Sequence, residues 1–104
     1  PDDDGFKSAA AGADWGKTFY QILTDKPGNA TWPISGATYI LMYRVQDKPE
    51  HASSTLKFFD WAFATGNEMA AELEYVPLPG VVKSLVRTQW EKISASNGQP
   101  VRFK

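Results

Sequence analysis

The stretch that decides the fold is Thr38-Tyr39-Ile40-Leu41-Met42-Tyr43. Its apolar residues follow one another instead of alternating with polar ones, which is typical of a β-strand buried on both faces. Such a strand, expected to reach Arg44, needs neighbouring strands along its edges and further layers over its faces. The remainder of the chain offers no second strand of similar quality. We therefore expect this chain to be part of a larger protein, whose other part completes the sheet.

A long helix is expected after this strand. Asp47 can cap it, and Pro49 suits the first turn, where its missing N–H leaves no bond unmade. Gly66 should end it. Asp60 is expected to face solvent or to pair with Lys57. The apolar stripe consists of Ala52, Leu56, Phe59 and Phe63, widened by Phe58, Trp61 and Ala62. This is more aromatic surface than one helix contact buries.

The last strong helix is expected from about Val81 to Ile93, after an extended segment over residues 75–79. Its apolar residues recur at helical spacing, and its other face is polar. The apolar face consists of Val82, Leu85, Val86, Trp90 and Ile93, and the polar face carries Lys83, Arg87, Glu91 and Lys92.

Two shorter helices complete the expected elements. One covers residues 6–13, with Asp3 or Asp4 as its cap. The other is capped by Asn67 and should turn Met69, Ala70 and Leu73 inward. The chain is thus expected to combine several helices with one main buried strand.

Composition narrows the class of protein. The chain has 104 residues, of which 42% are hydrophobic, so it is expected to be globular and not disordered. The net charge of -1 and the lack of a basic run argue against nucleic-acid binding. The absence of cysteine excludes disulfides and thiolate metal ligands. No apolar run is long enough to span a bilayer. The first five residues have neither an initiator methionine nor signal-peptide features, so we expect processing or a start within a longer chain.

Catalytic and metal sites are not expected. The sequence has no paired carboxylates, nucleophile motif or phosphate-binding loop, which argues against an enzyme. His51 lies at an exposed helix start and is expected to be solvated. Residues 2–4 are consecutive aspartates, but they lack the spacing of a calcium loop. We therefore expect neither a metal nor a cofactor.

Several ordered blocks resemble bacterial periplasmic phosphate-binding proteins, the substrate-binding components of the phosphate ABC transporter. Residues 32–42, 56–62 and 75–79 are similar to three stretches of that family, in the same order. Ala13-Asp14-Trp15, Leu23-Thr24 and the closing helix with Val86-Arg87 and Trp90 also fit. The resemblance covers nearly the whole chain, but only the C-terminal third of the family. Gly80 is an exception to the resemblance, because the family pattern leads us to expect an acidic residue there that caps the last helix.

The resemblance implies an α/β, periplasmic-binding-protein-like fold of two lobes joined by a hinge, with only its C-terminal portion present. Residues 1–31 would finish the second lobe, and residues 32–38 would recross the hinge. Residues 39–104 would form the C-terminal part of the first lobe. The strands that pair with the expected strand at residues 38–44 would then lie in the N-terminal remainder of the same protein.

The resemblance also implies a function. The protein would capture inorganic phosphate in the periplasm, after export, and deliver it to the membrane subunits of an ABC permease. The phosphate ligands are expected in the N-terminal portion, and none is expected in this chain. Ser35, Gly36 and Thr38 are expected to belong to the hinge, with Gly36 supplying backbone freedom.

A second interpretation remains open from the residues alone. The chain could be a small free-standing α+β interaction module, which pairs its strand with another chain by edge addition or as a dimer. A compact monomer with cooperative melting would favour this module, whereas a molten or aggregating chain would favour part of a larger protein.

Overall fold

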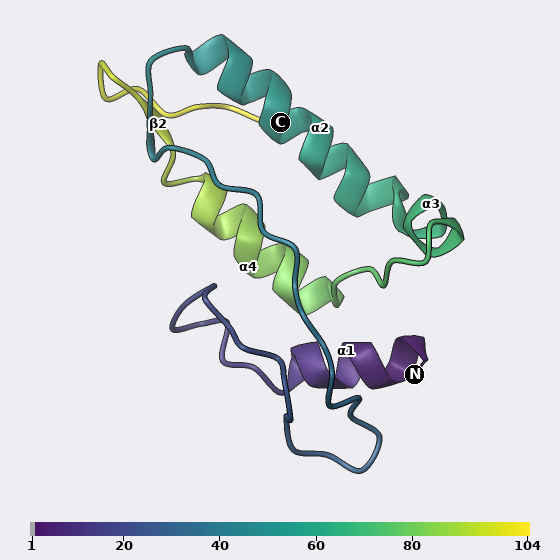
Figure 1. Ribbon diagram of the computed structural model, residues 1–104. Helices are drawn as coiled ribbons and strands as arrows, with labels where there is room; N and C mark the ends of the chain where they lie inside the picture. The colour runs from purple at the N-terminus through teal and green to yellow at the C-terminus, as the bar shows by residue number, and fades with distance from the viewer. Residues whose placement is uncertain (1) are drawn as a thin grey trace.

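The structure, a computed structural model, describes residues 2–104. The elements in chain order are α1 (Asp3–Ala11), β1 (Val45–Gln46), α2 (Pro49–Thr65), α3 (Asn67–Glu72), α4 (Gly80–Trp90) and β2 (Ser94–Ala95). Figure 1 shows α2 and α4 side by side, with α1 below α4 in this view. No helix within the described residues is both long and apolar enough to cross a membrane.

Helix α4 links the two buried clusters of the molecule. Val82, near its start, is buried with Trp15 and Leu23 from the N-terminal region. Trp90, at its end, is buried with Leu56 of α2 and Phe103 of the C-terminal tail. Both clusters take their α4 residues from the apolar face that helical spacing predicts, so that prediction is confirmed.

Aromatic rings make up much of the second cluster. Trp90 stacks on Phe63 of α2, with ring centroids 5.6 Å apart, and meets the edge of Phe103 at 5.3 Å. The hydroxyl of Ser53 also donates to the backbone carbonyl of Arg102, which ties the tail to α2. The C-terminal tail therefore belongs to the α2–α4 core.

The helix ends differ from the sequence predictions in their caps. Asp2, one residue earlier than predicted, accepts a hydrogen bond of 2.7 Å from the N–H of Gly5 and caps α1. Helix α2 starts after Lys48 with no side-chain cap, so the prediction of Asp47 is wrong. Its first residue is proline and Gly66 follows its end, as predicted. Cap choice depends on the local turn of the chain, which residue type alone does not fix.

Helix α3 is short and more exposed than predicted. Asn67 is its first residue and not a capping residue. Leu73 is 71% exposed and Met69 is 52% exposed, so the prediction that they turn inward is wrong for the described chain, whereas Ala70 is half-buried. Six residues make fewer than two turns, so such a helix depends on its neighbours for burial.

Strands β1 and β2 form a parallel pair of two residues each, with Val45 opposite Ser94 and Gln46 opposite Ala95. Helices α2, α3 and α4 make the connection between them. Parallel strands joined by a helical crossover are the basic unit of α/β sheets, which normally carry layers on both faces. The structure is therefore a mixed helix–strand chain with a minimal parallel sheet.

The predicted buried strand at residues 38–44 is not a buried strand here, and this is the main correction. The segment is extended, but its residues are not assigned to a strand. Leu41 is 93% exposed and Tyr43 is 84% exposed, whereas Met42 packs against the core cluster. The physical reason is coverage, because the described chain lies over only one side of the segment.

The molecule is flat and carries more surface than a compact domain. Its radius of gyration is 15.2 Å, whereas a compact chain of this length has about 13 Å. Its principal extents are 49 × 29 × 17 Å. Its accessible surface is 7570 Å², against roughly 5,800 Å² for a compact monomer of this mass. Many large aromatic and aliphatic side chains are exposed on this surface.

Candidate functional site

An apolar hollow of about 560 Å³ lies beside the extended segment 37–42. Phe63 of α2 and Val86 and Trp90 of α4 line one part of it. Trp15 and Val82 line another part. The hollow therefore lies between the extended segment and the helices, and it joins the two buried clusters.

The extended segment is held mainly at its two ends. At its C-terminal end, the N–H of Ser94 donates to the carbonyl of Arg44 at 3.0 Å, next to the β1–β2 pair. Nearer its start, the hydroxyl of Tyr39 lies 3.2 Å from the backbone nitrogen of Gln21. Within residues 2–104, no backbone hydrogen bond joins residues 37–43 to another segment. The Tyr43 carbonyl accepts a hydrogen bond from the Gln46 side chain. The other polar groups of this backbone are available to a neighbouring strand.

The predicted hinge residues lie together in the connection that precedes this segment. The Ser35 hydroxyl donates to the Trp32 carbonyl at 2.9 Å, which closes a local turn. A Cβ atom placed on Gly36 would meet no atom within 4 Å, so packing does not require glycine there. The Thr38 side chain is exposed.

These three residues line a second hollow, of about 300 Å³, together with Lys7 and residues 74–79. The Ser35 hydroxyl proton is already donated to a backbone carbonyl, so it is not directed at an anion. The Ser35 hydroxyl is therefore engaged within its own turn.

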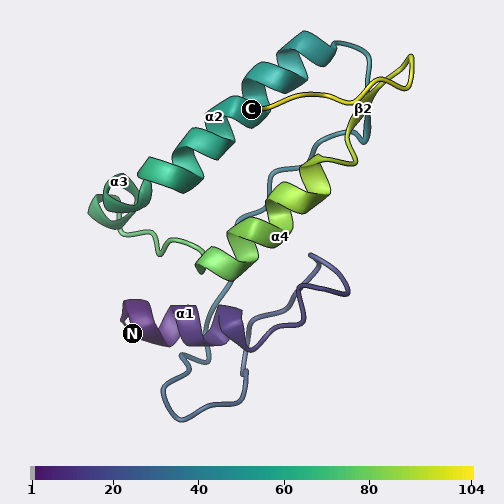
Figure 2. The same ribbon diagram turned by 180° about the vertical axis from the view of Figure 1, so that it is seen from behind.

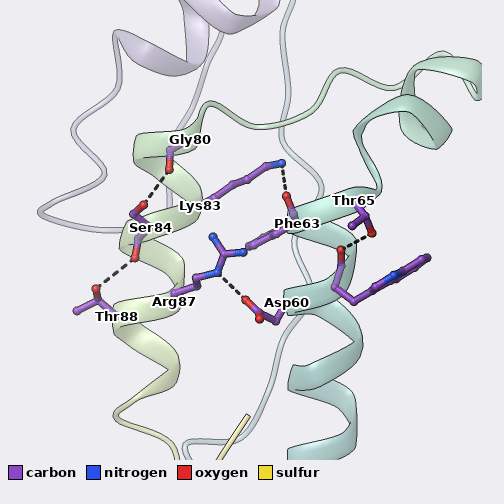
Figure 3. Close-up of polar contacts among 9 residues, drawn as sticks. Asp60, Phe63, Thr65, Gly80, Lys83, Ser84, Arg87 and Thr88 are labelled. Carbon is purple, nitrogen blue, oxygen red and sulfur yellow. Dashed lines mark hydrogen bonds and ion pairs between the residues drawn. The ribbon is translucent and has the colours of Figure 1, made fainter. Parts of the chain in front are cut away.

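A group of charged side chains joins α2 to α4, as Figure 3 shows. The Arg87 Nε atom donates to the Asp60 Oδ1 atom at 2.6 Å, and each side chain is about one third exposed, at 31% and 34%. The prediction that Asp60 faces solvent or pairs with Lys57 is wrong. Asp60 pairs with Arg87 of α4 and not with Lys57 of its own helix, because a guanidinium matches a carboxylate in geometry and charge.

Lys83 is buried at 7% exposed, although the sequence places it on a polar face. Its Nζ atom donates to the Phe63 carbonyl at 2.9 Å and to the Asn67 Oδ1 atom at 2.6 Å. Burial, and then the positive charge of Arg87, lower the pKa of the Lys83 ammonium from its usual 10.5. The two hydrogen bonds give the ammonium partners in place of the water that burial removes.

Sequence reasoning missed this charged group for a specific reason. Lys83 and Arg87 are four residues apart on α4, next to the apolar positions Val82 and Val86. A pair of cations that borders an apolar stripe is the one signal that could have predicted contact with a neighbouring helix. Their partner Asp60 lies 27 residues away in sequence, beyond the reach of local patterns.

Residues 2–104 contain no cluster of three or more His, Asp or Glu side chains that could hold a metal ion. His51 is exposed in the first turn of α2, as predicted. The features that remain are the extended segment, the apolar hollow and the exposed apolar side chains around them.

Comparison with known proteins identifies relatives of this chain. No family model matches it. It is 41% identical over 93 residues to the phosphate-binding protein PstS of Haemophilus influenzae. The matched region covers 88% of this chain and 28% of that protein. It is 38% identical over 102 residues to the same-named protein of Pasteurella multocida, covering 95% of this chain and 30% of that protein.

A PstS protein of Xylella fastidiosa is 37% identical over 92 residues, covering 86% of this chain. The chain thus spans between 25% and 30% of the length of these curated relatives. The match falls in their C-terminal portion. The resemblance found in the sequence is therefore confirmed, including its restriction to one part of the longer proteins.

Proposed function

We propose, from its similarity to the C-terminal portion of phosphate-binding proteins, that this chain is part of a protein that captures inorganic phosphate for an ABC importer. The observation that carries the proposal is identity of 36–41% to several such proteins over most of this chain. The protein binds and releases its ligand without transforming it. It works in the periplasm and passes phosphate to the membrane subunits of the permease.

The chain contributes architecture to this function. In the proposed two-lobe fold, residues 1–31 finish the second lobe and residues 39–104 belong to the first, with residue 1 outside the described part. Residues 32–38 form the crossing, where Ser35, Gly36 and Thr38 are hinge residues. The proposed boundary passes through the buried cluster of Val82, Trp15 and Leu23, so lobe movement would rearrange that cluster.

The phosphate ligands are proposed to lie mainly in the N-terminal remainder. Helix N-termini, hydroxyls and a guanidinium are the donors that suit a phosphate. The Arg87 guanidinium is already bound to Asp60, and the Lys83 ammonium is bound to a carbonyl and an amide. The cations that join α2 to α4 therefore serve structure, which supports placing the binding site outside this chain.

Equilibrium dialysis with labelled phosphate tests the proposal. The full-length protein should bind one phosphate tightly and retain it against excess sulfate. By resemblance to the family, the proposed site includes an Asp carboxylate that accepts a hydrogen bond from protonated phosphate, and ionised sulfate has no proton to donate. The 104-residue chain alone should bind none tightly. Preference of the full-length protein for another anion would contradict the phosphate assignment, and tight binding by the isolated chain would contradict the placement of the ligands.

A further inference from the structure

A buried apolar cluster, here called the boundary cluster, joins the two parts of the chain that the proposed lobe boundary separates. It contains Ala10, Trp15 and Leu23 from the N-terminal side. From the other side it contains Val82 of α4. Figures 1 and 2 show α1 beyond the N-terminal end of α4, on the opposite side from α2. Val82 is 1% exposed and Trp15 is 7% exposed, so both side chains are shielded from water in this arrangement.

Directional bonds across the same boundary are few. Among the described residues, every hydrogen bond between residues 2–31 and residues 39–104 involves the Tyr39 hydroxyl. Its oxygen lies 3.2 Å from the backbone nitrogen of Gln21 and 3.3 Å from the carbonyl oxygen of the same residue, at an exposed position. The two sides are therefore joined mainly by apolar packing. Such packing has no fixed direction, so it can hold two arrangements where a set of hydrogen bonds would hold one.

The start of the crossing segment is fixed to the N-terminal side. The Trp32 N–H donates to the Gly5 carbonyl at 3.1 Å, and the Asp25 N–H donates to the Pro33 carbonyl at 2.8 Å. Further along the crossing, Ala37 packs against the boundary cluster. A rotation between the proposed lobes would therefore be taken up after Pro33, directly beside the boundary cluster, and would change how the cluster packs.

We infer that Val82 and Trp15 are positioning residues for phosphate binding, because the packing of the boundary cluster favours one arrangement of the two lobes over the other. A ligand that needs closed lobes binds only the closed fraction of the protein, so its apparent affinity follows that fraction. Side chains that never touch phosphate then help to set its Kd. The inference rests on the proposed function for the two lobes and their ligand.

A matched pair of valines tests the inference in the full-length protein. Val82→Ala removes two methyl groups from the boundary cluster, and Val101→Ala removes the same groups from the α2–α4 core, which lies on one side of the boundary. The two side chains are buried to a similar degree, at 1% and 5% exposed, so the variants lose similar packing energy. Only Val82→Ala should change the arrangement of the lobes. Trp15→Phe tests the cluster from its other side and provides the readout if Val82→Ala does not fold.

The first readout is the distance between the lobes in the absence of phosphate. Ala11→Cys in α1 and Lys57→Cys in α2 replace exposed residues on the two sides of the boundary and carry spin labels. Val82→Ala should change the ratio of the two lobe arrangements by at least about fivefold, the lower end of typical couplings between sites. Trp15→Phe should change it in the same direction, and Val101→Ala should not change it. Unaltered label distances in all three variants would overturn the inference.

The second readout is the phosphate Kd, measured by equilibrium dialysis on the same variants. Val82→Ala should change the Kd by at least about fivefold, and Val101→Ala by less than about twofold. Tighter binding by Val82→Ala would mean that the boundary cluster favours open lobes, and weaker binding would mean that it favours closed lobes; either result supports the inference. Equal Kd values for the two variants would overturn the coupling of the cluster to phosphate.

The two readouts separate this inference from the proposed function. A wild-type protein that binds no phosphate, but whose label distances respond to Val82→Ala, would remove the proposed ligand and support the role of the boundary cluster in the lobe arrangement. A wild-type protein that binds phosphate tightly, with label distances that respond to neither Val82→Ala nor Trp15→Phe, would support the proposed function and overturn the inference.

Discussion

Lys83 on α4 donates a hydrogen bond of 2.9 Å from its Nζ atom to the backbone carbonyl of Phe63 in the last turn of α2. Carbonyls in that position have no further N–H of their own helix to accept from, and a cation near them is favoured by the helix dipole. The same ammonium donates to Asn67 at the start of α3. One side chain therefore ties α4 to the junction of α2 and α3.

Replacing Lys83 with methionine should destabilise the full-length protein by about 1–3 kcal/mol. The variant leaves a half-buried carbonyl and an amide oxygen without their donor, and hydrogen bonds to a charged group contribute in this range. Urea denaturation measures the change. Lys57→Met, at an exposed position of α2, is the control and should change the free energy of unfolding by less than about 0.5 kcal/mol. Equal effects of the two variants would contradict a special role for Lys83.

The lowered pKa of Lys83 predicts a pH dependence with a definite sign. Burial and then Arg87 lower this pKa below 10.5 in the folded protein. Between the lowered value and 10.5 the unfolded chain binds more protons at this site, so the free energy of unfolding rises with pH over that window. Below the lowered value, both states hold the proton and the contribution is constant.

Comparison of the wild-type protein with Lys83→Met isolates the pH-dependent contribution of Lys83 to the free energy of unfolding. The wild type should gain stability relative to the variant as pH rises toward 10.5, over the window between the lowered pKa and the usual one. Urea denaturation at a series of pH values gives the difference. A difference that shrinks with rising pH would mean that the ammonium is stabilised by its partners more than burial penalises it.

The Asp60–Arg87 ion pair should contribute modestly. Its 2.6 Å geometry is good, but each side chain is about one third exposed, so solvent screens much of the attraction. A double-mutant cycle with Asp60→Asn and Arg87→Gln should give a coupling energy of at most about 1 kcal/mol, which falls in high salt. The exposed pair of Asp14 and Lys17 is the control and should show no measurable coupling. A larger coupling for the control pair would contradict this ranking by exposure.

Local periodicity was enough to predict the helix layer. Leu56, Val82 and Trp90 are buried where the spacing of apolar residues places them, because a helix face repeats within a few residues of sequence. The proline at the start of α2 and the glycine after its end follow from backbone chemistry in the same local way.

Tertiary contacts could not be predicted in this way. Asp60 and Arg87 meet only because α2 and α4 lie side by side. Lys83 finds its partners in Phe63 of α2 and Asn67 of α3, which lie 20 and 16 residues away in sequence. The apolar run at residues 38–43 is a different case. It predicts burial on both faces, and the described chain covers one. The hinge roles of Ser35, Gly36 and Thr38 come from resemblance and stay predictions.

Glu74 should be replaceable by glycine with a gain in stability. It follows the end of α3 with a φ of 64°, in the left-handed region that side chains disfavour. The N–H groups of Tyr75 and Glu74 bond the carbonyls of Ala70 and Ala71, the pattern of a helix end that normally uses glycine there. Glu74→Gly should raise the free energy of unfolding by up to about 1 kcal/mol.

Glu74→Ala is the matched control, since it removes the same carboxylate but keeps a Cβ atom. It should give no such gain, and thermal denaturation of both variants separates the backbone effect from the charge effect. Equal stabilisation by alanine and glycine would show that the wild-type protein is destabilised by repulsion of the Glu74 carboxylate and not by the backbone conformation.

Three consecutive aspartates at the start of the chain should differ sharply in their value to α1. Only Asp2 accepts a hydrogen bond from a free N–H of the first turn, that of Gly5, whereas Asp3 and Asp4 are inside the helix. Asp2→Ala should therefore cost about 1 kcal/mol. Asp3→Ala and Asp4→Ala lose only a favourable interaction with the helix dipole, about 0.3–0.5 kcal/mol each. Amide exchange over α1 measures the local effect, and a greater loss of protection in either of the latter variants would assign the cap to another residue.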